Sequence, residues 1–272
     1  MARRRAWRTG SPDPSRWKWR SCPTRSGRAR SRGLRSMDET PNLTLPLLMP
    51  AQAQKHVTVN EAFVRIDALA NLTLESATVA DPPAAAAEGL AYFVPPGATG
   101  DWAGHEGQIA LRTGGGWDFA APRPGWRGFL RDEGVAVLFA GGSCLRGQVT
   151  HSVHGAGLAL LVAEAEVTVA AGASHVTAPL IPSHTLVFGV TARVVTALTG
   201  TLTAWQLGNP GAPGRYGSGL GTAAGSHANG LLGQPMAFYA PTPLQLDAEG
   251  GAFAGGAVRV AVHYLALTLP AA

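Results

Sequence analysis

LLVAEAEVTVAAG, at residues 160–172, alternates two kinds of side chain with a period of two. Successive side chains of a β-strand point to opposite faces of its sheet, so this period predicts a half-buried strand. The set predicted to face inward is Leu161, Ala163, Ala165, Val167 and Val169, and the set predicted to face outward is Val162, Glu164, Glu166 and Thr168. This part of the chain is therefore expected to form a sheet with one solvated face.

Two longer segments repeat the pattern, HTLVFGVTARVVTALTG at 184–200 and AVRVAVHYLALTLP at 257–270. The first alternates Leu186, Phe188, Val190 and Val194 against Thr191 and Arg193, and the second alternates Val258, Val260, Val262 and Tyr264 against Arg259 and His263. Turns rich in glycine and proline separate such segments, and the glycine-rich stretch 215–226 is interpreted as a loop. Residues 146–272 are predicted to form a β-sandwich of jelly-roll type.

Shorter β-type segments precede this region: LAYFV, GQIAL, GWDFA, GWRGFL and VAVLFA, all within residues 90–140. Each is bounded by Gly, Pro or Asp, which is typical of strands joined by tight turns. They predict a small antiparallel β-meander. The glycine-rich stretch GGSCLRGQ at 141–148 is the best candidate for a boundary. The fold class is thus mainly β, with a module at 37–145 followed by the sandwich.

A single helix is predicted within AQAQKHVTVNEAFVRIDALA, residues 51–70. Thr58 and Glu61 have the spacing of a capping box, so the helix should begin near Thr58. Its apolar face is predicted to be Phe63, Ile66, Leu69 and Ala70, with Arg65 and Asp67 off that face. The polar cluster ahead of it, Gln52, Gln54, Lys55 and His56, is compatible with a catalytic cluster, a metal site or an assembly element.

The basic charge of the chain is concentrated in its first 36 residues. They hold 12 of the 22 Lys and Arg residues and one acid, Asp13, which leaves 10 bases against 16 acids in the remainder. A basic nucleic-acid-binding arm, a targeting peptide and a start codon assigned too early could each explain this leader. We favour the last, with Met37 as the true start and residues 1–36 as a disordered leader. The acidic remainder argues against nucleic acid as a partner.

Cysteine usage and hydropathy limit the classes of protein further. The chain has two cysteines, Cys22 and Cys144, so neither a disulfide framework nor a cysteine-based zinc site is expected. No apolar run reaches the roughly 20 residues that span a membrane, so membrane insertion is not expected. Synthesis and folding in a reducing cytoplasm fit this composition.

Motifs for catalysis are weak. His151 and His154 lie in a predicted loop without ligand-forming neighbours, so no metal is expected. The carboxylate pairs Glu164/Glu166 and Asp247/Glu249 have strand spacing, but the first pair lies on a predicted solvent face. No serine has the context of a nucleophile elbow. The chain is therefore predicted not to be an enzyme and to need no cofactor.

Aromatic residues give the best candidate binding site. Flat indole and phenol rings in turns of a β-scaffold can stack on sugars, although burial in a core is the common alternative. The candidate carbohydrate-binding residues are Trp102, Trp117, Trp126, Trp205 and Tyr216.

Several motifs between residues 37 and 142 resemble an uncharacterised domain family of alphaproteobacterial prophages and gene transfer agents. They are the Gln-Ala-Gln-Lys-His-Val run, Asn60-Glu61-Ala62, Asp67-Ala68-Leu69, Gly100-x-Trp102-x-Gly104, Gly116-Trp117 and Pro124-Gly125-Trp126. The C-terminal motifs RYGSGLG, AFYAPTPLQLDAEGG and GGAVRVAVHYL look like the β-domain that follows in fibre and spike components. No catalytic residues can be transferred from this resemblance.

The resemblance implies a tail fibre or head spike that contacts surface polysaccharide. Two alternatives stay open: a small polysaccharide depolymerase and a ligand-free structural adaptor. It implies a homotrimer whose partners are further copies and other phage-like particle proteins. The helix residues Phe63, Ile66 and Leu69 would serve assembly. Such a protein would be cytoplasmic during assembly and then part of a released virion-like particle.

Overall fold

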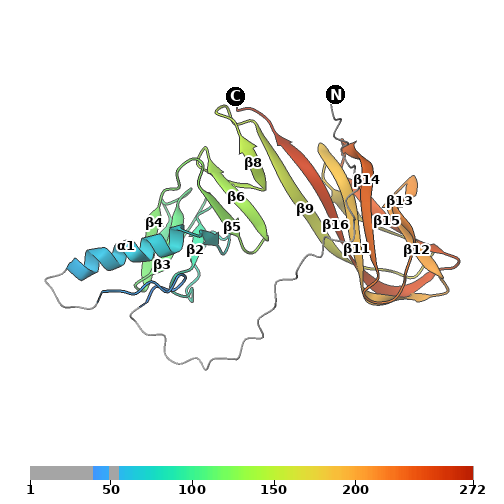
Figure 1. The fold of residues 1–272 in the computed structure, drawn as a ribbon, viewed down its shortest axis with the longest axis horizontal. Helices are drawn as coiled ribbons and strands as arrows, with labels where there is room; N and C mark the ends of the chain where they lie inside the picture. The colour runs from blue at the N-terminus through green and yellow to red at the C-terminus, as the bar shows by residue number, and fades with distance from the viewer. Residues whose placement is uncertain (1–38, 49–54, 272) are drawn as a thin grey trace, which may run out of the picture. The chain divides into compact units, whose positions relative to one another are not determined.

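The computed structural model describes residues 39–48 and 55–271, without the side chains of residues 55 and 56. The predictions for the leader, Cys22 and the polar cluster of Gln52 and Gln54 lie outside the described residues. Mainly β structure is confirmed: in the described part of the chain, one α-helix, α1 (Lys55–Leu69), precedes a series of β-strands, and a short 3₁₀ helix, η2 (Gly100–Trp102), lies between two of them (Figure 1).

The strands that follow α1 form a seven-stranded sheet in the order β4-β3-β2-β1-β5-β6-β7 (Figure 1). Their bounds are β1 (Thr73–Leu74), β2 (Ala91–Phe93), β3 (Ile109–Thr113), β4 (Gly116–Ala120), β5 (Arg127–Leu130), β6 (Val135–Ala140) and β7 (Ser143–Arg146). The predicted antiparallel meander is confirmed for β2–β4 and for β5–β7. The prediction did not include β1, which pairs parallel with both β2 and β5 and joins the two meanders. Two residues are too few to show a period.

Two glycine pairs close hairpins in this sheet. Gly114 and Gly115 join β3 to β4, and Gly141 and Gly142 join β6 to β7, all with positive φ. Two successive residues with positive φ make a type I′ turn, whose twist matches that of the strands it joins. The stretch 141–148 thus contains a hairpin and β7, and a domain division at residue 145 stays a prediction.

Helix α1 begins about one turn earlier than predicted, at Lys55. Thr58 therefore lies inside the helix, and the predicted capping box is wrong. Between Pro50 and Thr58 the sequence has no proline or glycine to stop the helix earlier. The predicted apolar face is also wrong in part, because Ile66 is 52% exposed while Asp67 is 2% exposed. Leu69 packs against the core of the sheet, and Phe63 is half-buried.

Asp67 is buried because its carboxylate holds the turn that precedes α1. Oδ1 accepts hydrogen bonds from the Thr40 hydroxyl at 2.7 Å and from the Leu43 N–H at 2.5 Å. Oδ2 accepts one from the Asn42 N–H at 2.9 Å. A charged group can be taken out of water when its lone pairs are satisfied in this way. The carboxylate thereby fixes one end of the helix.

The rest of the chain forms two antiparallel sheets around one core. The four-stranded sheet has the order β10-β15-β12-β13, and the five-stranded sheet has the order β14-β11-β16-β9-β8 (Figure 1). The strands are β8 (Gln148–His151), β9 (Gly157–Thr168), β10 (Ser174–Ile181), β11 (Thr185–Gly200), β12 (Ala204–Asn209), β13 (Ala212–Leu220), β14 (His227–Phe238), β15 (Thr242–Glu249) and β16 (Phe253–Thr268). Buried side chains from both sheets share this core, as in a β-sandwich. The jelly-roll connectivity stays a prediction.

The predicted alternation is confirmed in β9 and β16 and wrong in part of β11. Val187 and Val190 are fully buried, whereas Leu186 and Phe188 are half-buried. The register with both neighbouring strands shifts between Val187 and Gly189, so the chain carries an extra residue there. Such a β-bulge reverses the alternation. The glycine-rich stretch interpreted as a loop also contains a strand, β13.

Candidate functional site

Three of the five candidate aromatic residues are buried in hydrophobic cores. Trp102 and Trp205 are 0% exposed and Tyr216 is 3% exposed. A ring that is buried on both faces has no surface to offer a sugar, so these three positions do not form a stacking site. Tyr216 and Trp205 belong to the core of the sandwich, where the Trp205 indole N–H donates to the Gly221 carbonyl at 3.0 Å. Burial raises the pKa of Tyr216 to about 12.

Trp117 is half-buried in an aromatic cluster with Trp102. Their ring centroids lie 5.0 Å apart in an edge-to-face arrangement, and Tyr92 contacts both rings. The Arg112 guanidinium lies 5.3 Å from the centre of the Trp117 ring. The contacts of Trp117 are therefore those of a packing residue.

Trp126 has a different environment, because it packs against the core on one side and lines an open recess on the other. We call this hollow of about 500 Å³ the Trp126 recess. Its lining residues are Arg65, Leu69, Phe119, Ala120, Ala121, Arg123 and Trp126. Helix α1 supplies the first two, strand β4 supplies the next two, and the connection from β4 to β5 supplies the others.

A tight turn places Arg123 beside Trp126. The Trp126 N–H donates to the Arg123 carbonyl at 3.1 Å, and Gly125 has a φ of 92°. Pro124 fixes φ near −65° at the second position, so the four residues form a type II turn, which needs glycine at the third position. Two hydrogen bonds of 2.9 Å attach the turn to Phe139 of β6. The Gly125 N–H donates to the Phe139 carbonyl, and the Phe139 N–H donates to the Trp126 carbonyl. The recess is thus built on rigid backbone.

Arg65 forms the opposite wall and connects α1 to β4. Its Nε lies 2.9 Å from Asp118 Oδ2, and its Nη2 donates to the Phe119 carbonyl at 3.2 Å. Arg65 and Leu69 share a helix face because they are four residues apart. Phe119 carries His105 stacked on its ring, with centroids 3.6 Å apart.

A second recess of about 540 Å³ adjoins Arg65. It is lined by Val57, Asn60, Glu61, Val64, Arg65, Thr113 and Asp118. The Trp126 recess is lined by an aromatic ring and two guanidinium groups, and no carboxylate is among its lining residues. The second recess has two carboxylates, of which Asp118 is already paired with Arg65.

The other carboxylate pairs noted in the sequence have structural partners. Glu166 and Glu164 lie 2.7 and 3.8 Å from Arg259 on the exposed face of the five-stranded sheet. Asp247 accepts hydrogen bonds from the Gln245 amide, and Glu249 accepts one from the Gly219 N–H. Among the residues described here, no three His, Cys, Asp or Glu side chains are grouped to hold a metal ion.

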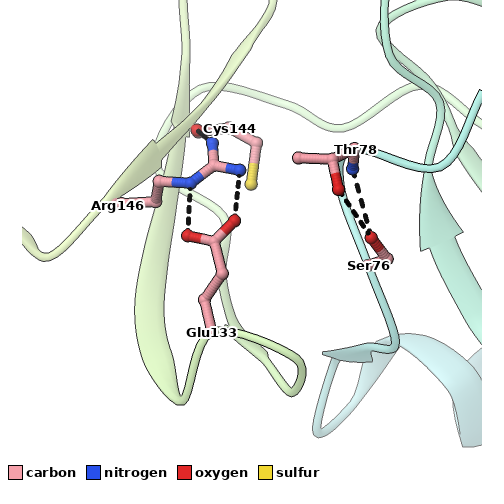
Figure 2. Close-up of polar contacts among 5 residues, drawn as sticks. All are labelled: Ser76, Thr78, Glu133, Cys144 and Arg146. Carbon is pink, nitrogen blue, oxygen red and sulfur yellow. Dashed lines mark hydrogen bonds and ion pairs between the residues drawn. The ribbon is translucent and has the colours of Figure 1, made fainter. Parts of the chain in front are cut away.

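A separate group of polar contacts includes the backbone carbonyl of Cys144, whose side chain is part of the hydrophobic core of the sheet (Figure 2). Arg146 donates from Nε and Nη2 to the two carboxylate oxygens of Glu133, at 2.7 and 2.6 Å, and from Nη1 to the Cys144 carbonyl. The hydroxyls of Ser76 and Thr78 form a hydrogen bond with each other, with their oxygens 3.2 Å apart. Burial raises the pKa of the Cys144 thiol to about 11. Because the thiolate is the reactive form, this shift disfavours reaction of Cys144 at neutral pH.

The sequence missed Arg65, Phe119 and Arg123 as binding candidates. Arg123-Pro-Gly-Trp126 is a recognisable turn, and this signal could have placed Arg123 beside the tryptophan. Arg65 gave no signal, since its partners on β4 are more than 50 residues away in the sequence. Of the five predicted aromatic residues, the structure brings together Trp102 with Trp117, and it places Trp205 and Tyr216 in one core. Trp126 lines a recess with Leu69, which was predicted for assembly, and with residues that were not predicted.

Comparison with known proteins shows that the region containing the recess matches a protein family. Residues 59–144 match the family described as "Protein of unknown function (DUF2793)". This range contains every lining residue of both recesses except Val57. No curated protein matches the chain. A chain of the cyanophage Pam1 capsid asymmetric unit is 27% identical, over 45% of this chain and 93% of that chain, with a TM-score of 0.32. That score is too low to support an argument. In the described part of the chain, no helix has the length and hydrophobicity to cross a membrane.

Proposed function

We propose that this chain is a structural, host-surface-binding component of a phage or gene transfer agent particle, a tail fibre or head spike that contacts surface polysaccharide. The observation that carries the proposal is the Trp126 recess, a preformed hollow with an aromatic wall and a few fixed polar groups. Small-molecule sites in proteins have this composition. The sequence resemblance to fibre and spike components supplies the particle context.

A site of this size binds weakly, and multivalency compensates for that weakness. Stacking with a few hydrogen bonds gives a dissociation constant on the order of millimolar, or about 4 kcal/mol. A homotrimeric fibre that presents several recesses to one cell surface raises the effective affinity without new contacts. The chain assembles in the cytoplasm with other particle proteins and leaves the cell in the released particle.

The exposed side of α1 supports assembly. Ile66 is 52% exposed, and Val59, two turns earlier on the same face of the helix, is 36% exposed. An interface with another protein would remove these apolar side chains from water.

The test is adsorption of particles that carry Trp126→Ala. Loss of the indole removes one wall of the recess, so adsorption to host cells should fall by about tenfold or more. Because Trp126 also packs against the core, the melting temperature should fall, and adsorption is compared at a temperature where the variant is folded. Tyr239→Ala is the matched control, because it removes a 77% exposed aromatic ring from the sandwich. Normal adsorption by a stably folded Trp126→Ala particle would overturn the proposal.

Two alternatives have specific support. A depolymerase would use Glu61 and Asp118 in the second recess. Wild-type protein that shortens the polysaccharide, together with a Glu61→Gln variant that does not, would favour this alternative. A ligand-free adaptor would explain why Trp102, Trp205 and Tyr216 are all buried. For the adaptor, neither cells nor glycans should bind the particle through this chain.

A further inference from the structure

We infer that the Trp126 recess takes an acidic sugar, one that carries a carboxylate or a sulfate. This inference rests on the proposed function and narrows its ligand to a chemical class. The recess is lined by two arginines and by no aspartate or glutamate. Both of its charged lining side chains are therefore cationic, although the part of the chain from residue 37 onward is acidic, with 16 acids against 10 bases.

Arg123 is the free cation of the recess. Its side chain is exposed, and it forms no hydrogen bond or ion pair with any residue that the structure describes. Its backbone is fixed, because its carbonyl closes the type II turn to Trp126. A guanidinium can meet a carboxylate or sulfate with two parallel N–H donors. Arg123 therefore supplies a charge without a counterion, next to the aromatic wall.

Arg65 supplies a second, oriented guanidinium. Its Nε and Nη2 are held by Asp118 and the Phe119 carbonyl, while Nη1 has no partner among residues 39–48 and 57–271. A guanidinium has five N–H donors, so the bonds to β4 fix its plane and leave donors for a ligand. Arg65 is partly neutralised by Asp118, and Arg123 is thus expected to contribute more to discrimination between acidic and neutral sugars.

The test compares trigalacturonate with its methyl ester, and a sulfated oligosaccharide with its unsulfated parent, by titration calorimetry on the full chain. Wild type should bind each acidic probe about tenfold more tightly than its neutral counterpart. Arg123→Gln should remove most of that preference and leave binding of the neutral probe unchanged. Arg193→Gln is the matched control, because it removes one exposed positive charge from the outer face of the sandwich. The basic leader is present in every variant and cancels in this comparison.

The outcomes separate this inference from the proposed function. Equal binding of acidic and neutral probes, an equal loss in Arg193→Gln, or no binding of any acidic probe overturns the acidic-sugar inference. In each of these cases the adsorption defect of Trp126→Ala would still support glycan binding. Normal adsorption by Trp126→Ala would instead remove the proposed function itself.

Discussion

Burial assigns different roles to the four tryptophans that the structure describes. Trp102 and Trp205 are enclosed, Trp117 packs edge-to-face on Trp102, and Trp126 alone among them lines a recess. All four occur in glycine-rich surroundings, and the sequence shows no difference in pattern between an enclosed ring and an open one. Only the tertiary neighbours, such as the Gly221 carbonyl that satisfies the Trp205 indole, decide which ring is accessible.

Trp102→Ala should destabilise the fold by about 3–5 kcal/mol, because it leaves a cavity beside Tyr92 and Trp117. Trp102→Phe should be milder, since it keeps an aromatic ring and no described residue accepts a hydrogen bond from the Trp102 indole N–H. Chemical unfolding of both variants measures the difference. A Trp102→Ala protein with wild-type stability and weakened glycan binding would instead show that Trp102 belongs to the binding site.

Asp67 illustrates what a helical pattern cannot reveal. The spacing of apolar residues on α1 predicts that Ile66 is buried and Asp67 exposed, and the structure shows the opposite. The reason is the turn at residues 40–45, whose N–H and hydroxyl groups need an acceptor on the helix. Periodicity describes contacts with an apolar core and contains no information about polar partners more than 20 residues away.

Charge pairing connects the turn after β5 to strand β7. Arg146 of β7 hydrogen-bonds to Glu133 through both carboxylate oxygens, and this bond holds the pKa of Glu133 below its usual value. The group contributes stability when it is ionised, so the contribution is present above about pH 4.5 and is lost as the pH falls through the lowered pKa.

Glu133→Gln should therefore lower the free energy of unfolding at pH 7 by at most about 1 kcal/mol, because both side chains are 35% exposed and solvent screens the pair. The difference between the variant and the wild type should shrink as the pH falls below about 4.5 and through the lowered pKa of Glu133. Urea unfolding over a series of acidic pH values measures this. A difference that does not change with pH would show that the ion pair is not its cause.

The outer side of α1 should matter for assembly and not for folding. Ile66→Asp places a charge at a position that is 52% exposed, so thermal unfolding should be unchanged while the oligomer dissociates. Val153→Asp, at a 97% exposed position in the sandwich, is the control. Sedimentation velocity measures both variants. An Ile66→Asp chain with the wild-type oligomeric state would exclude this face of the helix from the interface.

Regular strands were the most predictable elements. The boundaries of β4 and β6 match the segments GWDFA and VAVLFA, and the alternation in β9 and β16 is correct. Errors occur where a local pattern is too short or is interrupted. Strand β1 has two residues, and the bulge at Phe188 reverses the phase of β11 without any change in composition. Parallel pairing of β1 depends on partners that lie far apart in the sequence.

Under the proposed function, the whole molecule acts by repeating a weak binding site. Each copy of the chain in an oligomer would present one Trp126 recess. If the affinity of one recess is millimolar, a trimer gains from multivalency only when its recesses reach the same surface. Sugar binding at the recess is therefore the step on which the proposed function depends, and assembly determines how strongly the particle adheres.

A ¹H–¹⁵N correlation spectrum of the tryptophan indoles detects sugar binding at the recess. The Trp126 signal is assigned by its absence from Trp126→Phe, and polysaccharide fragments from the host surface are then titrated into the wild-type chain. The Trp126 indole should shift in a saturable manner, while the signal of Trp205, enclosed in the sandwich core, should stay in place. An unmoved Trp126 signal at saturating fragment, or shifts confined to other tryptophans, would contradict binding at the recess.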